Sequence, residues 1–405
     1  MVTSSPISAP AVGESAKVAT DLLTALRSLP DPRRGGPRRH PLPYVLAVLV
    51  AAFSSVGFAS LTGAAQWAAA AGPGVLRALG ARPDPFTGAI HAPSGATLRR
   101  MATRLDPTAF EAVIAAWTAA NLRPANGLEP AKGRVPVAVD GKTVRGAKVP
   151  GQVTPHLLSA ATHHTPVVLA QRQIPDKTNE IPCVAILLED LRQAGHDICQ
   201  ITFTLDALHT QHTTATLLHD SGAGYVMTVK ANQPKLLAAI AEQLRTQEPA
   251  RTGSRDRGHG RTEERHLHAV DATGIAFPGA AQVFRVIRHT GGLDGQRTTK
   301  EVVHGITNLT AEHADPAALA TLVRGHWAIE NSIHWVRDVS FGEDASRVRT
   351  GTAPAVLAAI RNIVTTALRR AGATNTAAAR RATALDPTAP IRLLTQGSNH
   401  DKCPL

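Results

Sequence analysis

Two aspartates stand where buried strands are expected to end. Asp140 follows the apolar run 135–139, and Asp206 follows Ile-Thr-Phe-Thr-Leu at 201–205. A lone aspartate at a strand end is most often a turn former, but two on neighbouring strands of one sheet can lie side by side. Two like charges placed together are costly unless a cation holds them. The pair therefore predicts a hard divalent cation such as Mg²⁺, bound by carboxylate oxygens.

A third ligand is expected from the amphipathic helix predicted at 317–338, which contains His-Trp-Ala-Ile-Glu-Asn-Ser-Ile-His-Trp. At about 100° per residue, this helix separates into faces. The predicted faces are an apolar stripe of Leu322, Ile329, Ile333 and Val336, a working face of Val323, His326, Glu330, His334 and Arg337, and a third side with Arg324, Trp327, Asn331 and Trp335.

The working face allows two kinds of metal chemistry. Glu330 could complete the carboxylate set, whereas His326, Glu330 and His334 together could bind zinc. The zinc interpretation is weaker because the spacing matches no known zinc helix. The two tryptophans could stack on a splayed base, or they could pack against neighbouring strands as core area.

The elements that must position these residues change type along the chain. Up to residue 126 the pattern is helical, and from 135 onward β-branched runs alternate with helices. Helices are expected at 22–29, within 42–61, and at 64–71, 75–79, 96–105, 109–120, 181–193, 234–244, 317–338 and 354–370; strands are expected at 135–140, 156–161, 167–173, 201–205, 225–230, 265–270, 282–288 and 301–306. The Ala/Thr-rich tail after Gly372 is expected to be loosely held.

Composition favours a nucleic-acid partner. The chain of 405 residues carries 43 Lys+Arg against 31 Asp+Glu, a net charge of +12. Arg99 and Arg100 are plausible phosphate contacts, although such runs can also simply solubilise a surface. Three cysteines cannot form a disulfide framework, and nothing at the N-terminus marks export, so a cytosolic protein is expected.

One uncharged run, residues 42–61, is long enough to cross a bilayer. It contains serines and a glycine, whereas spanning helices are usually richer in Leu, Ile and Phe. The run is therefore predicted to be a buried core helix, with no membrane association.

Five segments in order, VAVDGKTVRGAK, TFTLDALHTQ, YVMTVKANQ, HGRTEER and RGHWAIENSIHWVRDVSFGEDASRVRTG, make the chain resemble a DDE insertion-sequence transposase of the ISAs, or H-repeat-associated, type. The resemblance runs from about residue 22 to 370. It implies an α+β protein with an N-terminal all-α domain that binds the element's ends. A ribonuclease-H-like α/β catalytic core follows, with a β-rich insertion before the last acidic helix. The expected boundaries are 15–126 for the helical domain, 132–250 and 312–372 for the core, 251–311 for the insertion and 373–405 for the tail.

The resemblance also implies roles for individual residues. Asp140, Asp206 and Glu330 match the three acidic residues and would hold two Mg²⁺ ions, which Mn²⁺ could replace. A wider group of transposases carries Tyr, Arg, Glu and Lys on the last helix, where this chain retains only the glutamate, so phosphate gripping would pass to Arg324 and Arg337. The full set of expected DNA contacts is Lys142, Arg145, His209, His259, Arg261, Arg324, Trp327, Trp335, Arg337, Arg99 and Arg100.

Three functions are compatible with these residues. An active transposase would cut DNA at insertion-sequence ends and join them to a target, in the bacterial cytoplasm and as a homodimer on double-stranded DNA. A catalytically inactive relic would still bind ends, and a structure-selective nuclease would cut without joining. Asp338, Glu343 and Asp344 could replace Glu330 as the third ligand, but they rank lower because Asp344 is expected to pair with Arg347.

Overall fold

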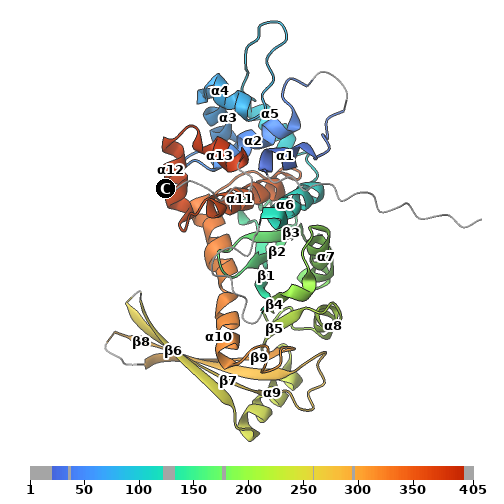
Figure 1. Ribbon diagram of the computed structural model, residues 1–405, viewed down its shortest axis with the longest axis vertical. Helices are drawn as coiled ribbons and strands as arrows, with labels where there is room; N and C mark the ends of the chain where they lie inside the picture. The colour runs from blue at the N-terminus through green and yellow to red at the C-terminus, as the bar shows by residue number, and fades with distance from the viewer. Residues whose placement is uncertain are drawn as a thin grey trace, which may run out of the picture.

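The computed structural model describes residues 21–34, 38–121, 133–175, 179–258, 260–293 and 297–395. The molecule is elongated, with a helical part at one end, a sheet in the middle and a long β arm at the other end (Figure 1). The helices that open the chain are α1 (Leu22–Arg27), α2 (Leu42–Phe53), α3 (Leu61–Ala70), α4 (Pro73–Ala78), α5 (Gly95–Ala102) and α6 (Pro107–Asn121). Serine side chains cap two of them, because Ser60 accepts from the N–H of Gly63 and Ser94 from that of Thr97.

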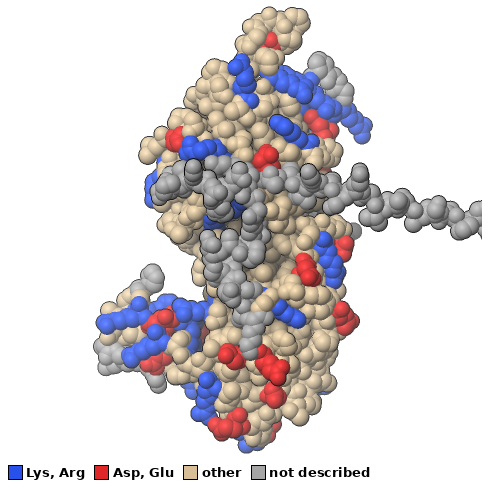
Figure 2. All heavy atoms as spheres, in the orientation of Figure 1, with Lys and Arg blue, Asp and Glu red and all other residues tan. Residues whose placement is uncertain are grey.

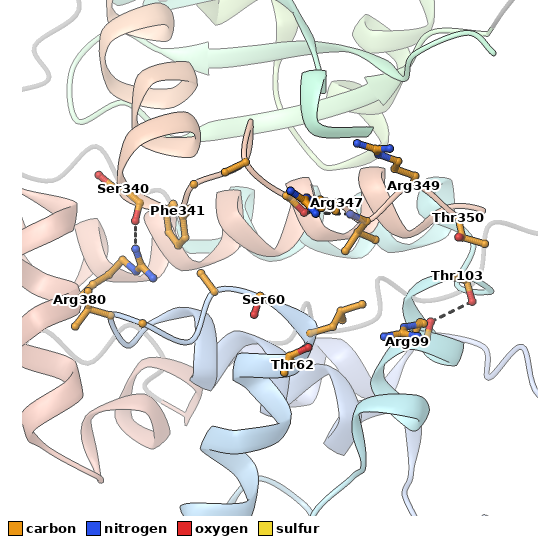
Figure 3. A pocket seen from close by; sticks show the side chains of 18 residues that line it. Ser60, Thr62, Arg99, Thr103, Ser340, Phe341, Arg347, Arg349, Thr350 and Arg380 are labelled. Carbon is orange, nitrogen blue, oxygen red and sulfur yellow. Dashed lines mark hydrogen bonds between the residues drawn. The ribbon is translucent and has the colours of Figure 1, made fainter. Parts of the chain in front are cut away.

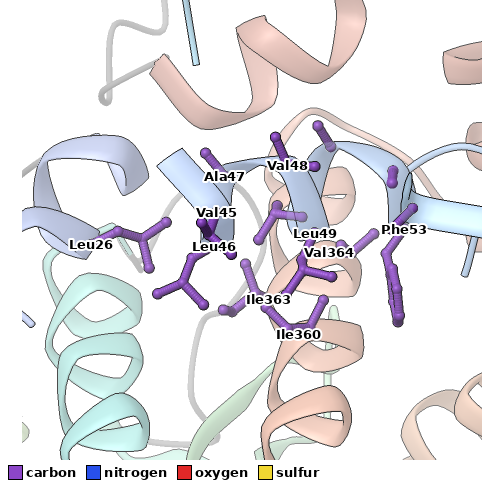
Figure 4. Close-up of a cluster of buried hydrophobic side chains, with 14 of the residues drawn as sticks. Leu26, Val45, Leu46, Ala47, Val48, Leu49, Phe53, Ile360, Ile363 and Val364 are labelled. Atoms are coloured by element: carbon purple, nitrogen blue, oxygen red, sulfur yellow. The ribbon is translucent and has the colours of Figure 1, made fainter. Parts of the chain in front are cut away.

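Helix α2 is the centre of the helical part. It is formed by the uncharged run, and 11 of its 12 side chains are buried. A helix of that length spans only about 18 Å, well short of a bilayer core. Among the described residues, no helix is long and apolar enough to cross a membrane. Leu49 and Phe53 of α2 lie beside Ile360 and Val364 of the late helix α11 (Ala353–Arg370), as Figure 4 shows, so the prediction of a buried core helix is confirmed.

The chain's last described helices also belong to this helical part. Helices α12 (Thr376–Leu385) and α13 (Ala389–Thr395) follow α11, and α13 packs on α1 and α2. Leu394 is fully buried in the same core. The expectation of a loosely held tail is therefore wrong for 376–395, because its apolar side chains close the helical core; residues 396–405 lie outside the described part.

The central sheet begins with three antiparallel strands and continues with two parallel ones. The strands are β1 (Val135–Thr143), β2 (His156–Thr162), β3 (Val168–Gln173), β4 (Ile201–Leu205) and β5 (Gly224–Val229), in the spatial order β3-β2-β1-β4-β5. Helices α7 (Glu180–Gln193), α8 (His212–Asp220) and α9 (Pro234–Thr246) provide the crossovers and cover, and α6 packs on β3. This is the topology of a ribonuclease-H-like core, so the predicted fold class is confirmed.

The β-rich segment continues the same sheet. Strand β9 (Arg297–Thr307) pairs antiparallel with β5, and β8 (Gln282–Gly292), β7 (Arg261–Asp271) and β6 (Ala250–Gly258) follow outward. Strands β7, β8 and β9 occupy the predicted runs but extend beyond them. Strand β6 was not expected, since its polar sequence is almost entirely exposed and shows no apolar alternation.

The predicted helix 317–338 is not one regular α-helix. It begins as α10 (Pro316–Gly325), turns at His326 and Trp327, and continues as two π-helical turns at Glu330–His334 and Val336–Ser340. The N–H of Trp335 donates to the carbonyl of Glu330, an i→i+5 bond that widens the turn. A face calculated at about 100° per residue is therefore less exact beyond Glu330, where Arg337 is buried. The buried stripe of Leu322, Ile329, Ile333 and Val336 is nevertheless confirmed.

Candidate active site

The two aspartates occupy neighbouring positions at one edge of the paired region. Strands β1 and β4 run parallel, and their pairing ends with Val139 opposite Leu205. Asp140 and Asp206 are the next residues along the chain, so they occupy adjacent positions as the sequence predicts, but β1 does not end at Asp140 and continues to Thr143 by pairing with β2. The Asp206 carboxylate Oδ1 accepts from the N–H groups of Leu208, at 3.0 Å, and His209, at 3.3 Å, which fixes the turn that follows β4.

Besides Asp206, two further carboxylates lie near enough to Asp140 to affect its pKa. Burial, followed by the negative charges of Glu180, Glu330 and Asp206, raises the pKa of Asp140 to about 7, although the N–H of Gly141 opposes the shift. Glu330 is exposed at the start of the first π turn. Within the described residues, however, no three His, Cys, Asp or Glu side chains converge closely enough to form a ready-made metal site. The carboxylates are close enough to influence one another electrostatically, but they are not arranged as a complete set of metal ligands.

The histidines of this helix do not assemble a zinc site with Glu330. His326 Nδ1 lies 3.0 Å from Thr204 Oγ1, which also contacts His163 Nε2 at 2.9 Å. His334 is turned instead toward Asp140, with Nδ1 3.5 Å from Oδ2. Burial lowers the pKa of His334 to about 3, so the ring is neutral beside that carboxyl group. The two histidines thus serve different neighbours, which does not support zinc.

A fourth carboxylate, that of Glu180, lies at the site and is not predicted from the sequence. It opens α7 after the N-cap Asn179, and its two oxygens contact His156 Nε2 at 2.7 Å and His209 Nε2 at 2.9 Å. A Cβ on Gly141 would collide with this carboxylate, so a glycine is needed for the close approach. Burial would raise the pKa of Glu180, but the two histidines outweigh it and lower the value to about 2. No local signal marks Glu180, because its two partners come from separate segments of the chain.

Replacing Glu180 with alanine is expected to weaken catalysis without weakening DNA binding. The side chain ties His209, three residues after Asp206, to the strand pair beside Asp140. Removing such a support typically costs about 10- to 100-fold in metal affinity or activity. The measurement is the Mg²⁺ concentration that gives half-maximal DNA nicking. Glu189→Ala, on the exposed face of the same helix, is the control and should leave that concentration unchanged.

Three of the expected DNA contacts are buried, and for these the prediction is wrong. Lys142 donates to Asp338 Oδ2 at 2.6 Å. His209 has a side-chain exposure of 0% and bonds Glu180. Arg337 is 1% exposed because the π turns direct it inward. A sequence records that a residue is charged, but not that a partner removes it from solvent.

Arg337 belongs to a buried charge cluster. Its Nη2 lies 2.6 Å from Glu343 Oε1, and Arg361 Nη1 of α11 lies 2.9 Å from Glu343 Oε2. Gln171 of β3 joins the cluster, accepting from Arg337 Nη1 at 3.1 Å and donating to Glu111 Oε1 of α6 at 2.6 Å. Burial raises the pKa of Glu111 to about 8. The cluster connects the π turns, the sheet and the helical part.

The acidic alternatives to Glu330 are all engaged elsewhere. Asp338 pairs with Lys142 and Glu343 with the two buried arginines. Asp344 Oδ2 lies 3.8 Å from Arg145 Nη1, so its expected pairing with Arg347 is wrong. Glu330 remains the strongest candidate for the third ligand.

The remaining expected DNA contacts lie at the surface. The side chains of Trp327 and Trp335 are 54% and 53% exposed, which does not fit core packing. Arg324 lies 3.1 Å from Asp256 of β6, and Arg261 lies 2.7 Å from Glu263. The exposed residues are Arg99, Arg100, Arg145, Arg261, Arg324, Trp327 and Trp335, whereas His259 lies outside the described residues. Figure 2 shows basic side chains gathered on the β arm and on the helical part.

Comparison with known proteins decides the family. A family model described as "Transposase DDE domain" matches residues 131–366, more than half of the chain. The chain belongs to the DDE transposase family. A second model, described as DDE_Tnp_1-associated, matches residues 23–118, which are the opening helices. The DDE transposases are phosphoryl-transfer enzymes that generally use divalent metals.

Relatives from bacteria support this assignment. The chain is 29% identical over 367 residues to "Putative transposase YncI" of Escherichia coli O157:H7, covering 86% of this chain and 87% of that one. It is 30% identical over 246 residues to "H repeat-associated putative transposase YhhI" of Escherichia coli K12, covering 56% of this chain and 62% of that one. The predicted resemblance to the H-repeat-associated transposases is therefore confirmed.

A solved structure is more distantly similar. It is described as a piggyBac transposase synaptic complex with hairpin DNA, and it matches 63% of this DDE transposase and 52% of its own chain, with 11% identity and a TM-score of 0.34.

Proposed function

We propose that this DDE transposase is active: it cuts DNA at the ends of an insertion sequence and joins them to a target. The observation that carries the proposal is the β1–β4 register, which places Asp140 and Asp206 at adjacent strand positions within the field of Glu330. Catalysis by phosphoryl transfer needs such an arrangement, because it depends on positioning and on charge compensation.

The proposed ligands of two Mg²⁺ or Mn²⁺ ions are Asp140, Asp206 and Glu330. The raised pKa of Asp140 fits this role, since burial and the negative charges of Glu180, Glu330 and Asp206 both disfavour its ionised form. When bound, the ions supply the Lewis acidity that activates the attacking oxygen and stabilises the leaving one. The chain's own part is to orient the carboxylates: backbone N–H groups hold Asp206, and the neutral ring of His334 lies beside Asp140.

The flanking parts supply the proposed DNA contacts. Trp327 and Trp335 present exposed rings on the helix that carries Glu330, where a splayed base could stack. The segment 15–126 is proposed to bind the element's ends, with 132–250 and 312–372 as the catalytic core and 251–311 as an insertion that contacts DNA. Joining requires two ends together, so we propose a homodimer on DNA, acting in the bacterial cytoplasm at the nucleoid.

The test is nicking of a labelled duplex that carries the end of the flanking element, with Mg²⁺ or with a chelator. Metal-dependent nicking followed by strand-transfer products supports the transposase. Nicking without transfer would identify a structure-selective nuclease instead. Binding of the end without cleavage in either Mg²⁺ or Mn²⁺ would show a relic, and the carboxylates would then describe ancestry only.

A further inference from the structure

A cavity of about 710 Å³ lies between the helical part and the chain segment that follows the second π turn. One wall is the segment 340–350, and the other is formed by the start of α3 and by α5 (Figure 3). Arg347 and Arg349 come from the first wall, Arg99 from the opposite wall, and Arg380 closes one end. No carboxylate lines it; the other lining residues are apolar, glycine, serine or threonine.

No acidic side chain among the described residues pairs with the arginines that line this cavity. Arg347 has no ion pair or hydrogen bond to any other described side chain, and Arg349 donates only to the carbonyl of Gly146, at 3.3 Å. Both arginines are exposed, as is Arg99. Arg347, Arg349 and Arg99 therefore line the cavity without an acidic partner among the described residues.

Arg380 adds a fixed positive charge. Its side chain is 2% exposed, and its guanidinium group donates to the carbonyls of Phe53 at 2.9 Å, Ser55 at 3.1 Å and Ser340. It also lies 4.2 Å from the centre of the Phe341 ring. Burial, aided by the charge of Arg361, lowers the pKa of Arg380 to about 10, so the group stays charged at neutral pH. Carbonyl dipoles hold it, but no described carboxylate cancels its charge.

The start of α3 provides donors in addition to charge. Ser60, Leu61 and Thr62 line the cavity at the N-terminus of this helix, whose first turn contains no acidic residue. The first N–H groups of a helix lack intrahelical acceptors and carry the positive end of the helix dipole. Anions bind at such termini, most readily beside arginines.

The cavity is joined to the strand that carries Asp140. Arg349 contacts Gly146, just beyond β1, and a Cβ on Gly146 would collide with the carbonyls of Ser346 and Glu343. Arg145 lies next to this contact with 78% of its side chain exposed. Positively charged side chains thus extend from the residues after β1, Arg145 and Arg349, to the cavity. A row of this kind favours an extended polyanion over a small free anion.

We propose that this cavity grips the sugar-phosphate backbone of duplex DNA outside the active site. That the polyanion is DNA rests on the proposed function. Its backbone contacts in the cavity are Arg347, Arg349 and Arg99. Such contacts position the duplex without reading its sequence, so any duplex is a valid probe.

The test is the salt dependence of binding to a short labelled duplex of arbitrary sequence, measured by fluorescence anisotropy over a series of KCl concentrations. Each phosphate contact contributes about 0.9 to the slope of log K against log salt. The variant Arg347→Gln/Arg349→Gln is expected to reduce the slope by about 2, and Arg99→Gln, on the opposite wall, by about 1. Affinity at physiological salt should fall roughly tenfold or more for the double variant.

The matched control removes the same charge elsewhere. Arg192→Gln/Arg245→Gln alters two exposed arginines on α7 and α9 and should leave the slope unchanged. Equal slopes for the cavity variant and wild type would overturn the proposal. So would a decrease of the slope in the control variant as large as that in the cavity variant. Melting curves confirm that each variant is folded. If inorganic phosphate stabilises wild type but not the cavity variant, while their DNA slopes agree, the site takes a small anion and the DNA proposal is wrong.

Failure of this proposal is distinguishable from failure of the proposed function. The slope is measured without Mg²⁺ and without cleavage, so it does not depend on the carboxylates. A wild type that never cuts DNA but loses slope in the cavity variant would refute the activity and retain the backbone site.

Discussion

Asp140→Asn is expected to abolish metal-dependent cleavage, by at least about 10³-fold, while leaving the affinity for DNA within a factor of about two. Asparagine keeps the size of the side chain but removes the negative charge at the position where the β1–β4 pairing ends. The measurement is single-turnover nicking at saturating DNA, with binding measured in parallel. Asp220→Asn, an exposed aspartate at the end of α8, is the control and should cut like wild type.

The same variant is expected to stabilise the protein when metal is absent. The pKa of Asp140 is about 7 in the folded chain, against an ordinary value of 3.8. Between these two values the folded state keeps a proton that the unfolded state has lost, so the metal-free protein loses stability as pH rises through this window. Above pH 7 the cost is fully present, on the order of 2–4 kcal/mol.

The direction of this change in stability can be measured by thermal unfolding, without any assay of activity. At pH 8, Asp140→Asn should unfold at a higher temperature than wild type in chelator, whereas near pH 4 the two should agree. Mg²⁺ should raise the melting temperature of wild type at pH 8 and have little effect on the variant, because ligands must be deprotonated to bind metal. A variant that melts below wild type at pH 8 would contradict the inference that burial and neighbouring negative charges disfavour an ionised Asp140.

Glu343→Gln is expected to destabilise the chain by about 3–5 kcal/mol, because it leaves two buried arginines without a counter-charge. Burial opposes the charged form of Glu343, but Arg337 and Arg361 outweigh it and lower its pKa to about 2. The side chain has an exposure of 0%. Its stabilising effect is therefore present above about pH 4.5 and is lost as pH falls toward 2.

Urea unfolding at pH 7 measures this loss. Glu242→Gln, which breaks an exposed pair with Arg245, is the control and should leave the unfolding midpoint unchanged. A midpoint for Glu343→Gln equal to that of wild type would show that water or a neighbouring group replaces the lost charge. Because Arg337 lies in the π turns downstream of Glu330, the variant should also cut more slowly.

The carboxylate pair could be predicted from the sequence because an apolar run followed by an aspartate is a local pattern. Apolar runs precede Asp140 and Asp206, and the strand order brings the two residues together where the β1–β4 pairing ends, although β1 itself continues to Thr143 against β2. The buried helix α2 was predictable for the same reason, since its composition leaves no polar face.

The failures have equally physical causes. Arg337 was placed on the working face beside Glu330 and given a DNA contact by the family resemblance, but in the π turns it is buried against Glu343. Glu180 has no local signature, because its role depends on His156 and His209 from separate segments. Strand β6 lacks an apolar face, and its place is set by pairing with β7.

The packing of α11 against α2 has a consequence for the order of synthesis. Helix α2 leaves the ribosome early, but α11, which covers it, is translated near the end of the chain. Until then the face of α2 that packs on α11 is uncovered, although α1, α3 and α5 cover other parts of the helix, and exposed apolar surface of this kind is recognised by chaperones and proteases. A product truncated before Ala353 would keep all the proposed carboxylate ligands yet lack the cover for its helical part, so we expect it to be degraded rather than to compete with the full-length protein for DNA.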